Sequence, residues 1–401
     1  MPMFLRKIKH SLYIGLMKFF AGLGPGASHR AFVGTGSSAE LCRHILRTGA
    51  SKLLIVTDRP LREMGVADKA TSALQGSGID IAWYDGVLPD PTYDQVAAGA
   101  AVARAQGSDA ILAIGGGSSI DAAKIIAASA TSDESPRDWV GFGKVKHEVL
   151  KLYVIPTTSG TGSEATMGAV ISEPETHLKG VISGATLLPV ATALDPDLML
   201  GLPPHITAAT GMDALTHAIE AYIGVWERGT RLDDARISVK LVFEHLAAAY
   251  HDGANREARA GMAMGAYYGG LAINQVNVGS VHAIAHQLGG KYGIPHGLAN
   301  ALVLPHVLEF CHEEAAPRLA ELARLVGLGE PGDTDSQLAH RFIQAVRDLR
   351  TEVGIPDHSE KLQRGDFDAI ADKAIAEGDG YPVPRLLDKA SVMAMLGRIA
   401  C

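Results

Sequence analysis

Short apolar runs alternate with segments of helical periodicity from about residue 31 to residue 196. Four of these runs predict buried strands of a parallel sheet, at residues 52–57, 79–84, 110–114 and 151–155. Helices are predicted over residues 61–74, 93–105 and 120–128. This alternation indicates an open parallel sheet with helices on both faces, which binds ligands at the carboxyl ends of its strands.

Two segments rich in glycine and hydroxyl side chains directly follow two of the predicted strands. Residues 115–119 read Gly-Gly-Gly-Ser-Ser and open a helix, and residues 156–164 read Pro-Thr-Thr-Ser-Gly-Thr-Gly-Ser-Glu. A glycine backbone can approach a ligand closely, and a helix N-terminus favours negative charge, so the first segment fits a pyrophosphate. The structural alternatives are a capping box of Ser118 with Asp121 and an ordinary Ser/Thr-rich loop.

Asp58 follows the strand predicted at residues 52–57. A carboxylate in this position can accept hydrogen bonds from the ribose of an adenosine, and it repels a 2′-phosphate. The alternative is an aspartate that caps a helix or forms a turn.

The second half of the chain predicts helix after helix from Pro204 onward. Asp213 and His217 lie four residues apart, as do His282 and His286, so each pair shares one face of a helix. Gly289 and Gly290 are expected to end the second helix, and the following turn returns His296. The helical pair of histidines and the third histidine after the turn can surround one metal ion, whereas hydrogen-bonded core histidines are the alternative. Asp213 and His217 form a second helical pair of ligand-type residues.

The first thirty residues differ from the rest because they contain five basic residues and no acidic one. Apolar side chains recur there at helical spacing, namely at Leu5, Ile8, Leu12, Leu16, Phe19 and Leu23. We expect an extension that packs on its own subunit or a neighbour, with a membrane-surface helix as the alternative. It carries no group suited to the chemistry and should be dispensable for catalysis. The sequence thus predicts an extension over residues 1–25, an α/β domain over 26–202 and a helical domain over 203–401.

Composition limits the classes of partner and the compartment. The net charge of −8 gives no support to a nucleic-acid partner, and no apolar run is long enough to span a bilayer. Three cysteines without a CxxC motif predict a reducing compartment, and therefore a cytoplasmic protein without disulfides.

Four long segments in this order resemble the iron-containing (group III) alcohol dehydrogenases. They are residues 115–124, 156–164, 211–220 and 279–297, and residues 297–306 are also similar. The resemblance begins near residue 31 and leaves residues 1–25 outside. It implies a Rossmann-like dinucleotide-binding α/β domain followed by an all-α domain, the architecture shared with dehydroquinate synthases.

The resemblance also implies roles for individual residues. The family's metal ligands correspond to Asp213, His217, His282 and His296, with Fe²⁺ expected and Zn²⁺ equally suited to these ligand types. His286 corresponds to a position near the substrate, where it could carry a proton or only shape the pocket. Asp58 corresponds to the residue associated with preference for NAD over NADP. The other implied cofactor-binding residues are Gly116, Gly117, Ser118, Asp121, Thr157, Thr158, Ser159, Gly160, Thr161 and Lys179.

The function implied by the resemblance is reversible hydride transfer between a primary or secondary alcohol, or its aldehyde or ketone, and NAD. A homodimer is the base expectation for its assembly. The alternatives are a metal-dependent polyol dehydrogenase, a non-redox lyase or hydrolase with the same architecture, and a non-catalytic nucleotide-binding protein. The complete set of one aspartate and three histidines favours the alcohol dehydrogenase.

Overall fold

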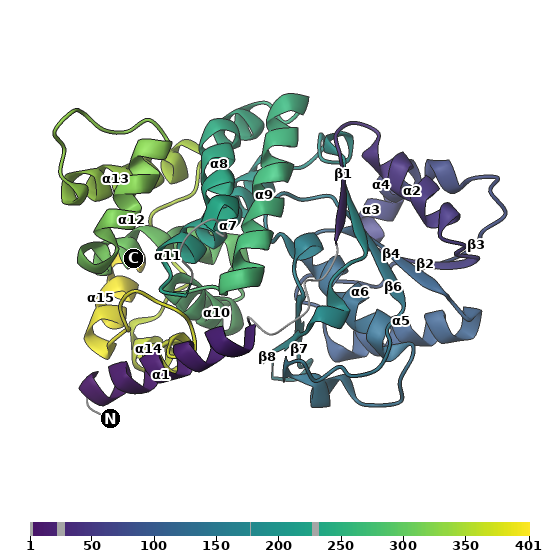
Figure 1. The fold of residues 1–401 in the computed structure, drawn as a ribbon, viewed down its shortest axis with the longest axis horizontal. Helices are drawn as coiled ribbons and strands as arrows, with labels where there is room; N and C mark the ends of the chain where they lie inside the picture. The colour runs from purple at the N-terminus through teal and green to yellow at the C-terminus, as the bar shows by residue number, and fades with distance from the viewer. Residues whose placement is uncertain (1–2, 22–28, 177, 227–231) are drawn as a thin grey trace. The chain divides into compact units, whose positions relative to one another are not determined.

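The computed structural model describes residues 3–21, 29–176, 178–226 and 232–401 (Figure 1). The chain divides into two compact units. The sheet unit consists of Ala27–Leu202 and Gly253–Gly270, and the helical unit consists of Met1–Gly26, Pro203–Asp252 and Leu271–Cys401.

The sheet unit contains a six-stranded parallel sheet in the order β1-β9-β6-β4-β2-β3. Its strands are β1 (Arg30–Val33), β2 (Lys52–Val56), β3 (Asp80–Tyr84), β4 (Ala110–Gly115), β6 (Lys151–Pro156) and β9 (Ala191–Leu194). The four predicted strands are all present, which confirms the parallel sheet. The sequence analysis did not predict β1 and β9, whose four residues each give little pattern to detect.

Alternation along β2 explains why helices cover both faces of this sheet. Leu53 and Ile55 pack into the cluster that includes α2 (Ser37–Arg47), and Leu54 and Val56 pack into the cluster of α5 (Tyr93–Gln106) and α6 (Gly117–Ser129). Each such buried side chain stabilises the fold by roughly 1.5–3 kcal/mol. The predicted helical cover on both faces is therefore confirmed.

The helix predicted over residues 61–74 is wrong in its continuity. The chain instead forms α3 (Arg59–Glu63), α4 (Val66–Ala70) and a short 3-10 turn at Ser72–Leu74. Gly65 lies between the two helices with φ 72°, in the left-handed region that glycine adopts without strain. That conformation interrupts the helix.

A second, three-stranded sheet was not predicted from the sequence. Its order is β5-β8-β7, with β5 (Gly141–Phe142) parallel and β7 (Gly168–Ser172) antiparallel to β8 (Lys179–Ser183). The β7–β8 hairpin follows the second hydroxyl-rich segment, and Asp121 accepts hydrogen bonds from both, as described below.

The helical unit is built from helices and connecting turns, as predicted, apart from a bridge between Ser359 and Ala400 in its described residues. The helices are α1 (Met3–Ala21), α7 (Pro204–Ile223), α8 (Asp233–His251), the end of α9 (Arg256–Val276), α10 (Ser280–Tyr292), α11 (His296–Phe310), α12 (His312–Leu325), α13 (Asp335–Glu352), α14 (Phe367–Gly378) and α15 (Lys389–Ile399). No described helix is long and apolar enough to cross a lipid bilayer.

The predicted end of the histidine helix at Gly289 and Gly290 is wrong. Helix α10 continues through both glycines and ends at Gly293, which has φ 62° and donates its N–H to the carbonyl of Gly289 at 2.9 Å. Glycine within a helix costs only about 1 kcal/mol relative to alanine, so packing overrides it. Pro295 then precedes His296, the first residue of α11.

Helix α1 packs on the helical unit, but not through its predicted apolar stripe. Arg6 and His10 bind residues of the segment between α14 and α15, and Lys18 donates to the carbonyl of Val225. Leu5, Ile8, Leu12 and Leu16 are exposed, and the side chain of Phe19 and the whole of Leu23 lie outside the described residues. Polar contacts and the buried side chain of Ile14 therefore hold this helix, and the exposed members of the stripe face outward.

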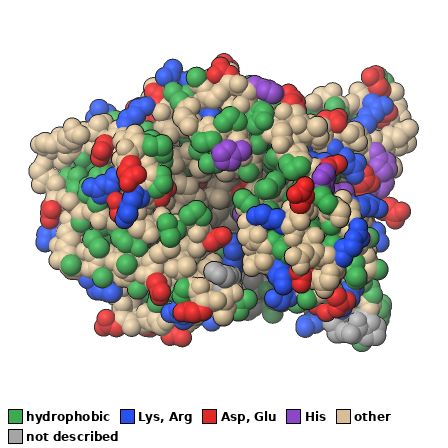
Figure 2. All heavy atoms as spheres, turned by 180° about the vertical axis from the view of Figure 1, so that it is seen from behind, with side chains coloured by type: hydrophobic (Ala, Val, Ile, Leu, Met, Phe, Trp, Pro, Cys, Tyr) green, Lys and Arg blue, Asp and Glu red, His purple; other side chains and the backbone are tan. Residues whose placement is uncertain are grey.

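Charged side chains of both signs are interspersed over the face drawn in Figure 2.

Candidate metal centre and cofactor loops

One aspartate and three histidines converge within the helical unit. Asp213 and His217 lie one turn apart on α7, His282 lies on α10, and His296 begins α11. One ligand atom from each residue lies within 4.8 Å of all the others. We call Asp213, His217, His282 and His296 the four-ligand cluster. The sequence analysis assigned these four residues to a metal, and the structure brings them together.

The four-ligand cluster depends on a close approach of α11 to α7. A Cβ atom at Gly297 would lie 2.2 Å from the carbonyl oxygen of Ala209, so a side chain at this position would push the two helices apart. Glycine therefore allows the first turn of α11 to bring His296 to the aspartate on α7.

The spacing of the donor atoms fits a metal ion. The carboxylate oxygen Oδ1 of Asp213 lies 3.9 Å from Nε2 of His217, 3.9 Å from Nε2 of His282 and 3.5 Å from Nε2 of His296. Tetrahedral ligands with bonds of about 2.1 Å lie about 3.4 Å apart. The three aspartate-to-histidine distances thus exceed this separation by no more than about 0.5 Å.

The protonation state of the imidazoles also fits a metal. Burial lowers the pKa of His296 to about 3 and lowers the pKa of His282 well below its ordinary value, so both rings are neutral near pH 7. His282 donates from Nδ1 to the Glu220 carboxylate at 2.6 Å, and its Nε2 therefore presents a lone pair to the four-ligand cluster.

Glu220 holds His282 from the second layer of the site. Its carboxylate accepts hydrogen bonds from the backbone N–H of Gly279 at 2.9 Å and of Val281 at 2.6 Å, in addition to the imidazole. The sequence analysis gave Glu220 no role. The signal was available, because Asp213, His217 and Glu220 follow the i, i+4, i+7 spacing of one helix face.

The side-chain amide of Asn300 faces three hydrogen-bond acceptors of the four-ligand cluster and cannot satisfy them all. Its Nδ2 lies 2.7 Å from the Asp213 carboxylate and 3.2 Å from Nε2 of both His282 and His296. An amide carries two hydrogens and cannot donate to three acceptors, so at least one lone pair is left over. A cation fits this excess of acceptors.

His286 lies beside the four-ligand cluster and outside it. Its ring centroid is 5.7 Å from that of His282 and 5.4 Å from that of His296. Its Nδ1 lies 2.6 Å from the carboxylate of Glu377, which also accepts from Gln287 at 2.7 Å and Tyr381 at 2.7 Å. Glu377 was not found from the sequence because it lies 91 residues away from its imidazole partner.

In the sheet unit, the two hydroxyl- and glycine-rich segments meet at neighbouring strand ends. Gly115 of β4 is in register with Pro156 of β6, and Thr157 donates its N–H to the carbonyl of Gly115 at 3.0 Å. A Cβ atom at Gly116 would lie 3.3 Å from the Thr158 hydroxyl. We call residues 115–119 and 156–164 the two loops.

The predicted capping box at the start of α6 is wrong. Gly116 is the N-cap and no side chain caps the helix. The two carboxylate oxygens of Asp121 instead accept from Ser163 Oγ at 2.5 Å and from the N–H of Val170 at 2.9 Å. Asp121 therefore joins α6 to the end of the second loop and to strand β7.

The remaining predicted cofactor residues fall into contacts of several kinds. Gly117 approaches Thr161 so closely that a Cβ atom would lie 2.6 Å from its methyl carbon. Thr157, Ser159 and Gly160 are buried, and Ser159 donates to the sulfur of Met199 at 3.2 Å. Ser118 and Thr158 are half-buried.

Asp58 and Lys179 lie outside the two loops and have protein partners. Asp58 caps α3 and accepts from the N–H of Leu61 at 2.9 Å, so its alternative role as an N-cap is present; burial raises its pKa. Lys179 on β8 forms an ion pair with Asp90 at 2.6 Å.

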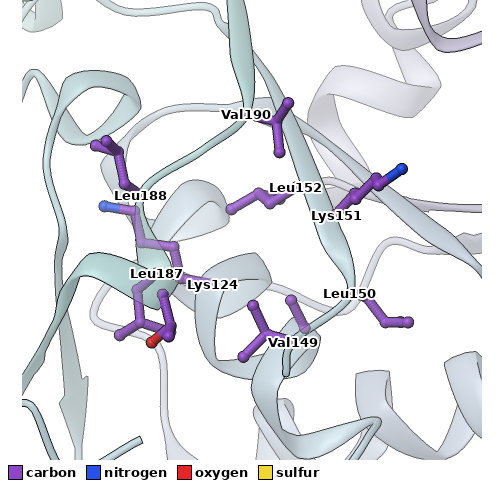
Figure 3. A pocket seen from close by; sticks show the side chains of 10 residues that line it. Lys124, Val149, Leu150, Lys151, Leu152, Leu187, Leu188 and Val190 are labelled. Atoms are coloured by element: carbon purple, nitrogen blue, oxygen red, sulfur yellow. The ribbon is translucent and has the colours of Figure 1, made fainter. Parts of the chain in front are cut away.

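A separate small cavity in the sheet unit does not extend this site. It has a volume of about 100 Å³, and Figure 3 shows aliphatic side chains around it, among them Val149, Leu152 and Leu187. Lys124 also lines the cavity, but its ammonium group binds Ser163 at 2.8 Å and Thr166 at 3.1 Å. Ligand pockets usually enclose about 300–1,000 Å³, so this space is too small for a dinucleotide.

Comparison with known proteins places most of the chain beside one group of enzymes. A family model described as "Iron-containing alcohol dehydrogenase" matches residues 28–196, and one described as "Fe-containing alcohol dehydrogenase family, C-terminal" matches residues 207–400. Alcohol dehydrogenase 4 of Schizosaccharomyces pombe is 39% identical over 355 residues, which cover 88% of this chain and 83% of that protein.

Two further relatives and one solved structure are also alcohol-oxidising enzymes by name and match most of the chain. The 1,3-propanediol dehydrogenase of Klebsiella pneumoniae is 37% identical over 86% of this chain and 91% of its own length. The NAD-dependent methanol dehydrogenase of Bacillus methanolicus is 35% identical over 88% of this chain and 93% of its own length. The crystal structure of a 1,3-propanediol oxidoreductase matches with a TM-score of 0.89 and 35% identity, covering 92% of this chain and 97% of that one.

Proposed function

The chain belongs to the iron-containing alcohol dehydrogenase family, and we propose that the four-ligand cluster holds its catalytic metal. The enzyme is an NAD-dependent oxidoreductase that interconverts an alcohol and a carbonyl compound. The observation that carries the metal assignment is the convergence of four ligand atoms around a centre where one amide group cannot satisfy every acceptor.

A divalent ion at this cluster supplies a Lewis acid, which lowers the pKa of an alcohol hydroxyl or polarises a carbonyl group. We propose Fe²⁺ on the basis of the family, while the ligand types serve Zn²⁺ as well. The residues contribute a preformed geometry: Glu220 orients His282, Gly297 admits His296 to the cluster, and Asn300 fixes the Asp213 carboxylate.

We propose that His286 moves the proton that the reaction releases or consumes. With Nδ1–H donated to Glu377, Nε2 is the atom that can accept a proton and pass it on. The imidazole is partly open, with 19% of its side chain exposed, which suits exchange with solvent. A purely structural role is the competing explanation, and a variant described below separates the two.

We propose that the two loops bind the dinucleotide. Support comes from their meeting at the carboxyl ends of β4 and β6 and from the start of α6 in the first loop. Asp58 is proposed to favour NAD over NADP, and Lys179 to bind the cofactor after exchanging its Asp90 partner. Asp121 is proposed to hold the second loop in place without binding the cofactor itself, since both of its carboxylate oxygens have partners within the protein.

The substrate class follows by analogy with the relatives. Their names refer to 1,3-propanediol, lactaldehyde and methanol, so we propose a small primary or secondary alcohol or its aldehyde or ketone. We further propose a cytoplasmic homodimer. The three cysteines, Cys42, Cys311 and Cys401, are unpaired, which suits a reducing compartment.

The decisive experiment is anaerobic purification followed by metal analysis and reconstitution of the metal-free protein with Fe²⁺ or Zn²⁺. Activity is then measured on a panel of alcohols and aldehydes with NAD and NADP. His217→Ala should lose metal and activity while the fold survives, whereas His306→Ala on α11 is the control that should keep the metal. Stoichiometric metal in the His217→Ala protein would contradict the site.

A further inference from the structure

Helix α1 has two faces with different partners. The inner face binds the helical unit: Arg6 pairs with Asp379 and donates to the carbonyl of Leu387 at 3.0 Å, and the His10 ring lies 2.7 Å from the carbonyl of Tyr381. Ile14 on the same face is 4% exposed. These contacts fix the rotation of the helix on the protein, and they therefore determine which side chains point away.

The outer face is a stripe of large apolar side chains. Its members are Phe4 (71% exposed), Leu5 (49%), Ile8 (42%), Leu12 (70%) and Leu16 (54%), and from Leu5 onward they follow one another at intervals of three or four residues. At 100° per residue they cover an arc of about 120°, and from first to last they extend about 18 Å along the helix. We call these five residues the outer stripe. Nothing in the described part of the chain covers it.

The charges beside the outer stripe are all of one sign. Lys7 and Lys9 are exposed and flank the stripe on opposite sides of the helix. Residues 1–30 contain no acidic residue, so the remainder of the chain carries a net charge of −13. The segment that exposes these apolar side chains is thus basic, in contrast to the net acidic remainder of the chain.

We propose that the outer stripe of α1 binds a membrane surface that contains anionic lipids. The helix lies along the interface with the five apolar side chains inserted and Lys7 and Lys9 at the level of the phosphate groups. The enzyme is attached to the surface rather than inserted across it, because no described helix can cross a bilayer.

A second copy of the chain fits the outer stripe less well. In a two-fold pair whose axis passes through the outer stripe, α1 would face α1, and Lys7 and Lys9 of both copies would come together with no acidic side chain on either helix to pair with them. Anionic lipid supplies both an apolar layer and the missing negative charge. Charge complementarity therefore favours the lipid surface over a pairing of α1 with α1.

The test uses the full-length, metal-loaded enzyme and sedimentation with vesicles. Vesicles of phosphatidylcholine alone are compared with vesicles that contain about 30% phosphatidylglycerol, at about 20 mM and about 500 mM salt. We expect co-sedimentation with the anionic vesicles at low salt, weaker binding at high salt and little binding to the neutral vesicles. Absence of binding to anionic vesicles at low salt overturns the proposal.

Substitutions distinguish vesicle binding through the outer stripe from nonspecific adsorption of the protein. Leu12→Glu should weaken binding about tenfold, since it removes an inserted side chain and adds a negative charge. Lys7→Gln with Lys9→Gln should lower binding to anionic vesicles specifically. Met64→Glu is the matched control, because Met64 is 67% exposed in the sheet unit and its replacement adds the same charge away from the stripe.

Light scattering on the same proteins tests whether a second copy of the chain covers the outer stripe. If Leu12→Glu converts an oligomer into a monomer, a second copy covers the outer stripe and the lipid proposal is wrong. Circular dichroism and alcohol oxidation should match the unaltered enzyme for Leu12→Glu, because this side chain contacts no part of the metal site. Equal vesicle binding by Leu12→Glu and Met64→Glu would also overturn the proposal.

Discussion

Glu220→Gln should weaken metal binding without removing any metal ligand. The Glu220 carboxylate accepts three hydrogen bonds, from the N–H groups of Gly279 and Val281 and from Nδ1 of His282. One oxygen serves Val281, and the other serves both Gly279 and His282. Glutamine keeps one oxygen, so its amide NH₂ must face at least one N–H donor.

The least costly orientation turns the amide NH₂ toward Val281. One buried N–H is then left unpaired, which costs about 1–3 kcal/mol, and the hydrogen bond to His282 loses its charge assistance. A hydrogen bond from this outer layer commonly accounts for roughly 10- to 100-fold in metal affinity, equal to about 1.4–2.7 kcal/mol. We therefore expect a rise of about 10- to 100-fold in the metal dissociation constant and a lower melting temperature.

Competition between the metal-free protein and a chelator of known affinity measures the dissociation constant. Glu321→Gln is the matched control, because Glu321 accepts a hydrogen bond from the Tyr222 hydroxyl on α7 but does not touch a metal ligand. The control should lose stability and keep its metal affinity. Wild-type metal affinity in Glu220→Gln would refute the assignment of Glu220 as the group that orients His282.

Four further expectations follow from particular contacts. Gly297→Ala should lose metal and about 1–3 kcal/mol of stability, because its Cβ would lie 2.2 Å from the Ala209 carbonyl. Gly290→Ala should be neutral or slightly stabilising, because its Cβ would meet nothing within 4 Å. Metal analysis and thermal melts measure both effects. His286→Ala should keep its metal, lose about 10²-fold in the rate of alcohol oxidation and flatten the pH profile of that rate, and Glu377→Gln should be intermediate. Loss of metal from His286→Ala would make His286 a ligand. An unchanged pH profile would leave His286 only a structural role. Asp58→Gly should raise kcat/KM for NADP relative to NAD, and equal use of both cofactors by the unaltered enzyme would remove the role given to Asp58. Iodoacetamide at about pH 8 should label Cys401 in the folded protein and spare the other two cysteines, since burial raises the pKa of Cys42 and Cys311 to about 12; mass spectrometry of peptides shows which thiols react.

Features carried by local periodicity could be predicted from the sequence. The strands β2, β4 and β6 are continuous apolar runs, and the pairs Asp213–His217 and His282–His286 are fixed by helical spacing alone. The joining of the two pairs into one site came from the family resemblance. The structure then supplies the physical reason, which is the close passage of α11 and α7 at Gly297.

Features set by tertiary packing could not be predicted. Gly289 and Gly290 resemble a helix end, yet packing carries α10 on to Gly293. Glu377 reaches His286 from a distant helix, and no local pattern reveals such a partner. The apolar periodicity of α1 was detected, but only the contacts of Arg6 and His10 show that the stripe faces outward.

The inner contacts of α1 have a consequence for how this protein is shortened. Family similarity begins at residue 28, so a natural trimming point would delete the whole helix. The deletion would strip Asp379 of its guanidinium partner and leave the Tyr381 carbonyl to water, while the Tyr381 hydroxyl still holds the carboxylate of Glu377 beside His286. The expectation that residues 1–25 are dispensable therefore has to be tested on the pH profile as well as on the rate. In this chain, the similarity to the family begins at residue 28, whereas hydrogen bonds and an ion pair make α1 part of the helical unit.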